Sequence, residues 1–204
     1  MFVYALAAIL GYLIGSISFS FLMGKMVKGI DIRKHGSGNA GATNTLRVLG
    51  LGSALTVLAL DIGKGVLAVW IGRWMSADLL VPIIAGFSVI VGHNWPVFFA
   101  FRGGKGIATT IGVVATLAVL PAVITGIIAI AAISLTRYVS LGSLLFTGLL
   151  PFTLLFMGRE TEYILLSVPI AVLAFYRHRS NIVKIANGTE HKLSFRRAKH
   201  QEEH

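Results

Sequence analysis

Long stretches of apolar residues are the feature of this sequence that most restricts its fold. Five runs are long enough, or nearly so, to cross a bilayer: 2–23, 48–71, 79–97, 141–157 and 164–175. A spanning helix needs about 20 mostly apolar residues and satisfies all its backbone groups internally. The last run is short, and Tyr163 and Tyr176 are expected to extend it as interfacial aromatics. The sequence therefore predicts an all-α polytopic membrane protein.

The composition agrees with a lipid environment. Only 13% of the residues are charged and the mean hydropathy is +0.81, whereas soluble domains contain about 25% charged residues. The absence of cysteine excludes disulfides, thiolate nucleophiles and zinc–thiolate sites. The net charge of +10 resides mainly between the apolar runs, as the positive-inside rule requires, so we expect no nucleic-acid partner.

The stretch 107–135 is ambiguous, because it fits either one tilted helix or two short helices broken near Leu120-Pro121. The first positive charges, Lys25 and Lys28, follow the first run, which predicts an N-terminus outside the cytoplasm. Two passes through 107–135 give seven transmembrane helices and place the basic C-terminus in the cytoplasm. Five helices with re-entrant segments are the alternative and leave the C-terminus on the same side. We expect one integral-membrane domain, 1–193, and a charged cytoplasmic tail, 194–204.

The first candidate site is the loop 35–44, which reads His-Gly-Ser-Gly-Asn-Ala-Gly-Ala-Thr-Asn and continues to Arg47. Glycine allows a backbone to approach a ligand closely, and successive N–H groups form anion-binding turns. Arg47 can bind a phosphate through a bidentate fork, and a helix starting near Thr43 would add its dipole. The alternative interpretation is a simple turn with N-capping residues, but a turn needs fewer glycines and small polar residues than this loop contains.

The second candidate site combines Gly92-His93-Asn94-Trp95-Pro96 with the segment Arg102-Gly103-Gly104-Lys105-Gly106. A Gly-Gly-Lys-Gly sequence before a helix is typical of phosphate binding, and Lys105 supplies a compact charge. The alternative is a glycine hinge beside a topology-determining lysine. His93 is a candidate base or a structural histidine, and Trp95 belongs more naturally to an interfacial belt.

Two further constellations carry weaker signals. Arg177-His178-Arg179-Ser180-Asn181 and Gly188-Thr189-Glu190 follow the last run, where a basic stop-transfer segment would explain only the arginines. Asp61 and Lys64 lie three residues apart within an apolar run and are expected to pair on one helical face.

The three loop motifs, in this order, resemble the bacterial acyl-phosphate:glycerol-3-phosphate acyltransferases, which are small polytopic inner-membrane enzymes. The resemblance covers the whole chain and rests on 37–47, on 92–106, and on His178, Asn181 and 188–190. Lys184 departs from it, because an arginine is expected there. The resemblance implies acyl transfer from acyl phosphate to the 1-hydroxyl of sn-glycerol 3-phosphate, which yields lysophosphatidic acid and phosphate in the first acylation of phospholipid biosynthesis.

The resemblance also implies roles for individual residues. Lys105, Ser37, Arg47, Asn181 and His93 are the catalytic candidates. Glycerol 3-phosphate is assigned to Ser37, Arg47, Lys105, His178 and Asn181. Acyl phosphate is assigned to the backbone from Gly38 to Asn44. The full substrate-binding set is Ser37, Gly38, Asn39, Gly41, Ala42, Thr43, Asn44, Arg47, Gly103, Gly104, Lys105, Gly106, His178 and Asn181. No metal and no cofactor are expected.

The identity of the base stays open at this stage. Soluble-type glycerolipid acyltransferases resemble one another in a histidine followed by an aspartate five residues later, the motif His-x4-Asp. This sequence contains no such pair. Acyl phosphate is already activated, and positioning alone is worth roughly 7–11 kcal/mol. We therefore favour a substrate phosphate oxygen as the base, with His93 or His178 as the second choice.

The expected partners are acyl phosphate, glycerol 3-phosphate and membrane lipid, and a functional link to the enzyme that makes acyl phosphate is a further hypothesis. We expect a multi-pass protein of the bacterial inner membrane with its active site on the cytoplasmic face. A membrane transporter of phosphate or an organophosphate is the competing function, because glycine-broken helices and the intramembrane Asp61 and Lys64 would suit one.

Overall fold

The computed structural model describes residues 1–193, and the regular structure of this part is entirely helical. The predicted tail, 194–204, lies outside the described residues. The helices are α1 (Phe2–Gly15), α2 (Phe19–Lys28), η1 (Ile32–Lys34), α3 (Ala42–Leu49), α4 (Leu51–Met75), α5 (Leu80–Asn94), η2 (Val97–Phe99), α6 (Ile107–Leu117), α7 (Val119–Thr136), α8 (Val139–Phe156), α9 (Thr161–Arg177) and α10 (Arg179–Ala186).

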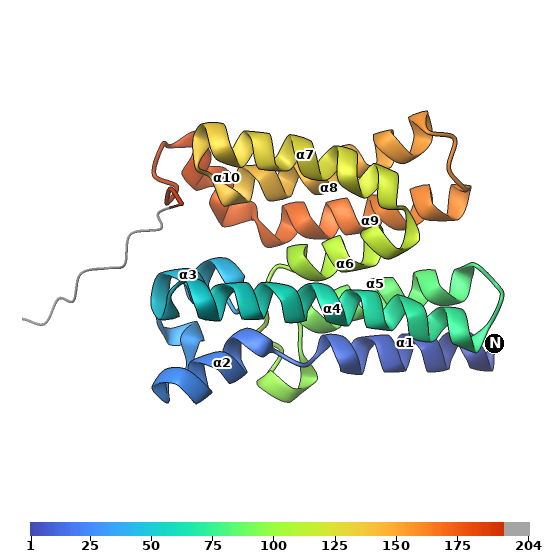
Figure 1. The fold of residues 1–204 in the computed structure, drawn as a ribbon, viewed down its shortest axis with the longest axis horizontal. Helices are drawn as coiled ribbons and strands as arrows, with labels where there is room; N and C mark the ends of the chain where they lie inside the picture. Colours follow the sequence, from blue (N-terminus) through green and yellow to red (C-terminus); the bar gives the residue numbers. More distant parts are fainter. Residues whose placement is uncertain (194–204) are drawn as a thin grey trace, which may run out of the picture.

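The long helices form two groups joined by a short helix (Figure 1). In the first group α5 packs against α1 and α4, and in the second group α8 packs against α7 and α9. The short α6 lies between the groups, against α4, α5, α7 and α9. The helices α2, α3 and α10 all lie at the end of the bundle opposite the N-terminus (Figure 1). Segments from both ends of the chain therefore meet at one end of the molecule.

Within residues 1–193, five segments are long and apolar enough to cross a membrane: Phe2–Lys28, Leu51–Met75, Leu80–Phe99, Val119–Thr136 and Val139–Phe156. The last predicted run, 164–175, becomes α9, which has 17 residues. The ambiguous stretch 107–135 forms two helices, α6 and α7. They meet at Ala118, whose backbone is not helical, and not at Leu120-Pro121. Pro121 lies in the first turn of α7, where its missing N–H costs no hydrogen bond.

The first predicted run, 2–23, is also interrupted, because α1 ends at Gly15 and α2 begins at Phe19. The Lys64 ammonium of α4 donates to the carbonyls of Gly15 (3.1 Å) and Ile17 (2.8 Å). Its charge is neutralised by Asp61, with Nζ to Oδ1 at 2.8 Å, which confirms the predicted pairing. An unsatisfied carbonyl is costly in an apolar interior, so the intramembrane charge satisfies the backbone at this break.

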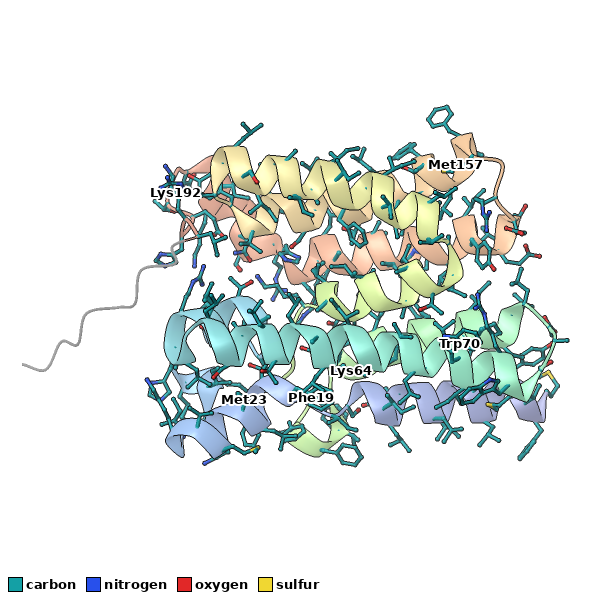
Figure 2. All side chains as sticks on the ribbon, in the orientation of Figure 1. Phe19, Met23, Lys64, Trp70, Met157 and Lys192 are labelled. Carbon is teal, nitrogen blue, oxygen red and sulfur yellow. The ribbon has the colours of Figure 1, made fainter. Side chains whose placement is uncertain are left out.

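The packed core lies where the two groups meet α6. It contains Val69, Val89, Val113, Leu150 and Ile170, all almost fully buried. Many large apolar side chains point outward instead, as Figure 2 shows along α1, α7 and α8. Outward apolar surfaces of this extent are expected of helices surrounded by lipid.

Candidate active site

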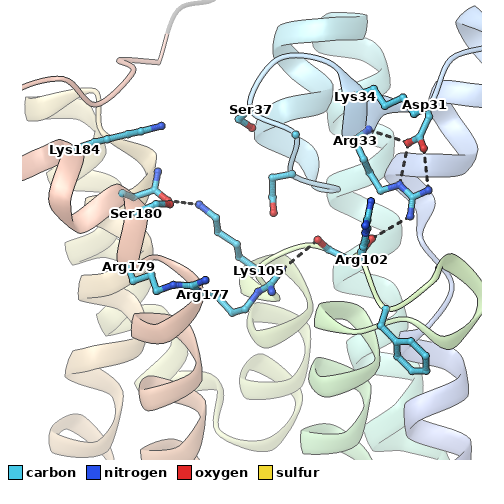
Figure 3. Close-up of a pocket in the computed structure, with 15 residues that line it drawn as sticks. Asp31, Arg33, Lys34, Ser37, Arg102, Lys105, Arg177, Arg179, Ser180 and Lys184 are labelled. Atoms are coloured by element: carbon cyan, nitrogen blue, oxygen red, sulfur yellow. Dashed lines mark hydrogen bonds and ion pairs between the residues drawn. The ribbon is translucent and has the colours of Figure 1, made fainter.

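A cavity of about 500 Å³ lies at the end of the bundle where α10 faces the two glycine-rich loops (Figure 3). It is lined by Asp31, Arg33, Lys34, Ser37, Gly38, Asn39, Phe101, Arg102, Gly103, Lys105, Arg177, Arg179, Ser180, Asn181 and Lys184. These residues come from three segments far apart in the sequence: 31–39, 101–105 and 177–184. The three motifs found in the sequence therefore meet in one site.

The cavity is strongly cationic. Seven of its lining residues are lysine or arginine and one, Asp31, is acidic. Asp31 is bound by the Arg33 guanidinium, with Nη2 to Oδ2 and Nε to Oδ1 both at 2.9 Å. This pair holds the pKa of Asp31 down at about 2. The single carboxylate thus neutralises only Arg33, and the remaining positive charge faces the cavity, as a site for polyanionic ligands requires.

The first glycine-rich loop is held in shape by hydrogen bonds to a side chain of α3, the helix that follows it. Asn44 of α3 is buried, and its amide donates to the carbonyls of Ile32 (3.1 Å) and His35 (3.0 Å). Its Oδ1 accepts the N–H of Ser37 at 2.8 Å. The loop itself is exposed from Lys34 to Gly38. Asn44 therefore shapes the loop, and its amide is already occupied by the protein.

The second glycine-rich loop is held by residues remote in sequence. The Arg177 guanidinium donates to Gly104 O from Nη2 (2.6 Å) and from Nε (3.2 Å), and to Gly103 O at 3.3 Å. The N–H of Gly104 donates to His93 O at 3.1 Å. Gly104 has no room for a side chain, because a Cβ there would overlap both His93 Nε2 and Ala40 O. This glycine lets the two loops and His93 meet.

Lys105 is the side chain on which the site converges. Its ammonium donates to Asn181 Oδ1, and Figure 3 shows it reaching across the cavity toward α10. Asn181 Nδ2 donates to Glu190 Oε1 at 2.7 Å, and the same oxygen accepts Ser140 Oγ at 2.8 Å. Burial lowers the pKa of Lys105 to about 8, and neighbouring Arg177 and Arg47 add to this effect. A lysine with a lowered pKa in a cleft indicates a functional site.

The two candidate histidines do not line the cavity. His178 is buried, with Nδ1 at 2.8 Å from Ala174 O, and burial lowers its pKa to about 4, so it is neutral at physiological pH. His93 is buried beneath the second loop, with Nδ1 at 3.4 Å from Asp61 Oδ1. His93 therefore lies beside the Asp61–Lys64 ion pair. The sequence analysis predicted that pair without His93.

The predicted site residues divide into two groups. The structure places Ser37, Gly38, Asn39, Gly103, Lys105 and Asn181 on the cavity wall. The others are near it without lining it: Gly41, Ala42, Thr43, Asn44, Arg47, His93, Gly104, Gly106 and His178. Arg47 is exposed on α3, close enough for its charge to act on Lys105.

Sequence reasoning missed several lining residues. Arg102 stood in the second motif but was left out of the substrate-binding set, Arg179 was attributed to topology, Lys184 was set aside, and Asp31 carried no signal. Arg33 and Arg177 were visible only as basic neighbours of the motifs. Their targets are backbone carbonyls on a distant loop, which no local pattern reveals.

Comparison with known proteins agrees with this geometry. A model of the family described as glycerol-3-phosphate acyltransferase matches residues 5–188. A glycerol-3-phosphate acyltransferase from Shouchella clausii is 53% identical and covers 97% of this chain and 100% of its own length. A protein of the same name from Halalkalibacterium halodurans is 55% identical over 89% of this chain and 91% of its own length.

Solved structures give the same result. The crystal structure of PlsY, an integral membrane glycerol 3-phosphate acyltransferase, in its glycerol 3-phosphate form has a TM-score of 0.88 and 36% identity, covering 94% of this chain and 96% of that one. Its lysophosphatidic acid form has a TM-score of 0.86. The transporter alternative finds no support in these matches. The chain therefore belongs to the glycerol-3-phosphate acyltransferase family and is a multi-pass integral membrane acyltransferase.

Proposed function

We propose that this enzyme transfers a fatty acyl group from acyl phosphate to the 1-hydroxyl of sn-glycerol 3-phosphate, releasing lysophosphatidic acid and inorganic phosphate as the first acylation of phospholipid synthesis. The cationic cavity is the observation that carries the proposal. Both substrates have a phosphate, and seven basic residues with one neutralised carboxylate surround a space of about 500 Å³. A thioester donor would not need so much positive charge at its reacting end.

The proposed binding roles follow the geometry of the cavity wall. Lys105 and Asn181, with Ser37 opposite, bind the phosphate and hydroxyls of glycerol 3-phosphate. Arg47 approaches the same phosphate from α3, and His178 supports the site from behind the wall. The backbone of the first loop, from Gly38 to Asn44, holds the acyl phosphate. Within residues 1–193 the N–H groups of Asn39, Ala40, Ala42 and Thr43 make no hydrogen bond to the protein, and they supply the donors.

In the reaction the 1-hydroxyl oxygen attacks the acyl carbonyl carbon, a new C–O ester bond forms, and the carbonyl–phosphate oxygen bond breaks. The hydroxyl proton passes to a phosphate oxygen of the donor. The described cavity wall offers no better base, since its only carboxylate, Asp31, has a pKa of about 2 and both histidines are buried away from it. Lys105 stabilises the negative charge that develops on the carbonyl oxygen and the leaving phosphate.

We further propose seven membrane passes, α1, α4, α5, α6, α7, α8 and α9, with the N-terminus outside and the C-terminus and active site cytoplasmic, in the bacterial inner membrane. The charge distribution supports this orientation. Of the basic residues described, all but Lys64, Arg73 and Arg159 belong to the end that carries α2, α3 and α10. The whole of 1–193 then acts as one membrane domain, with 194–204 as a cytoplasmic tail.

The decisive experiment presents purified protein with labelled glycerol 3-phosphate and one donor at a time: palmitoyl phosphate, palmitoyl coenzyme A or palmitoyl acyl carrier protein. We expect lysophosphatidic acid and stoichiometric phosphate only with palmitoyl phosphate. Product from a thioester alone would overturn the choice of donor.

The base is tested separately with His93→Gln and His178→Gln. We expect the kcat of each variant to keep the pH dependence of the parent protein. A loss of a hundredfold or more in His93→Gln, with glycerol 3-phosphate binding unchanged, would reject the substrate as base.

A further inference from the structure

The Arg177 side chain holds the second glycine-rich loop through contacts like those that Arg33 makes to Phe99 O, Arg102 O and the Phe21 ring. Two of the Arg177 nitrogens, Nε and Nη2, donate to Gly104 O, and Nη2 also reaches Gly103 O. Its guanidinium lies over the Trp95 ring, 5.4 Å from the centroid. Figure 3 shows it extending from α9 to the loop before α6. Arg177 thus bonds to two successive backbone carbonyls of the loop.

These contacts decide which way the loop's peptide groups face. The carbonyls of Gly103 and Gly104 turn toward Arg177, and the Gly104 N–H is held by His93 O. Within residues 1–193 the N–H groups of Gly103 and Lys105 make no hydrogen bond to the protein, and both residues line the cavity. The Lys105 N–H belongs to the same peptide group as Gly104 O and points away from it, so it can face an anion while Arg177 binds that oxygen. The Gly103 N–H shares its peptide group with Arg102 O, which accepts from Arg33 at 3.5 Å.

The glycines of the loop carry no side chain to pack. Arg33 holds the preceding part of the loop, donating to Phe99 O at 2.7 Å and Arg102 O at 3.5 Å, and Arg177 holds the glycines themselves. Lysine could not replace Arg177, since an ammonium lacks the planar fork that reaches two carbonyls while stacking on an indole. The α9 helix also belongs to the second helix group, so this contact links that group to the loop.

We propose that Arg177 is a positioning residue: it orients the Gly103–Gly104 and Gly104–Lys105 peptides so that the loop presents the N–H and the side chain of Lys105 to the phosphate of glycerol 3-phosphate. The inference rests on the proposed function, because it concerns the same site. It assigns Arg177 an action through the loop and not through contact with the substrate.

Arg177→Lys, which keeps the charge, tests the inference, and Arg73→Lys is its matched control. Arg73 likewise donates to a backbone carbonyl, Thr116 O at 2.8 Å, and lies 5.2 Å from the centroid of the Trp70 ring, but at the far end of α6. We expect Arg177→Lys to weaken glycerol 3-phosphate binding, measured by calorimetry without any donor, by about tenfold to thirtyfold, as the loss of one charged hydrogen bond implies. Arg73→Lys should bind like the parent.

Hydrogen exchange of the ligand-free protein separates positioning from direct contact. Loss of the restraint should accelerate exchange of the Gly104 amide, which His93 O holds, in Arg177→Lys and leave it unchanged in Arg73→Lys. Weaker binding with unchanged exchange would show that Arg177 contacts the phosphate directly and would overturn the inference. Unchanged binding and exchange would also overturn it.

A second variant guards against misfolding. Arg177→Ala should regain part of its affinity and its slow exchange when millimolar methylguanidinium fills the vacated place, and the absence of rescue in a protein with parental thermal unfolding would contradict the inference. The proposed function fails differently, since a parent protein that binds glycerol 3-phosphate but forms no ester from palmitoyl phosphate would reject that reaction and leave the positioning role intact.

Discussion

The two glycine-rich loops look alike in the sequence but are built differently. The first, 35–41, is exposed at residues 35–38 and is shaped by Asn44, which lies only a few residues later. The second, 100–106, is held by Arg177, Arg33 and the His93 backbone, all distant in sequence. Gly38 of the first loop is needed for its conformation, with φ +72°, whereas Gly104 of the second loop is needed for close packing. A glycine-rich motif therefore does not by itself say why its glycines are needed.

Substituting one glycine in each loop tests this difference most strongly. Gly104→Ala places a methyl group against His93 and the Ala40 carbonyl, so we expect a loss of activity of about a hundredfold or more, as misplacement of a reacting group implies. Gly38→Ala meets only Arg33 O at 3.2 Å and costs about 1–2 kcal/mol for its left-handed backbone. Initial rates and thermal unfolding of both variants decide the point, and equal losses would break the comparison.

Asn44 provides the next largest effect, confined to the first loop. Asn44→Ala removes three hydrogen bonds and leaves buried groups unsatisfied, so we expect about 2–3 kcal/mol lower stability and activity reduced about thirtyfold, as loosening of a positioned loop implies. Asn44→Asp keeps the acceptor for the Ser37 N–H but sets a buried carboxylate oxygen against the Ile32 and His35 carbonyls. It should therefore lower stability at least as much as Asn44→Ala. Denaturation and rate measurements check this. Parental stability in Asn44→Ala would mean that the loop is held from elsewhere.

The second loop should show a pH dependence that the first lacks. Lys105 has a pKa of about 8 in the free protein, and a bound phosphate favours its charged form. The affinity for glycerol 3-phosphate is thus at its maximum below about pH 8. Above that pH it falls by about tenfold per pH unit, until the pH reaches the higher pKa that Lys105 has in the complex. Calorimetry between pH 7 and 9.5 measures this. Lys105→Arg should abolish the dependence, and a flat profile in the parent would contradict the assignment.

The smallest effect is expected at Ser140, which is connected to Lys105 of the second loop only through Glu190 and Asn181. Ser140 donates to Glu190, which orients Asn181 against Lys105. Ser140→Ala should cost about 0.5–1.5 kcal/mol and raise the KM for glycerol 3-phosphate two- to threefold, with kcat little changed. Thr153→Val is a matched control, because its hydroxyl bonds only a carbonyl of its own helix, Leu149 O. Equal effects in both variants would mean that the chain through Glu190 does not reach the site.

The sequence alone determined the fold class, the approximate positions of the long helices and the three motifs that form the site. Apolar length and charge placement are local properties, and lipid leaves a chain few ways to satisfy them. The Asp61–Lys64 pair was predictable for the same reason, since three-residue spacing on a helix is a fixed geometry.

Only the tertiary structure decided how the site is held together. The breaks at residues 16–18 and at Ala118, the burial of His93 and His178, and the engagement of Arg33 and Arg177 by loop carbonyls depend on contacts between distant segments. A charged residue has the same appearance in sequence whether it determines topology, binds phosphate or supports a backbone. The choice is made by which group the folded chain places within hydrogen-bonding distance.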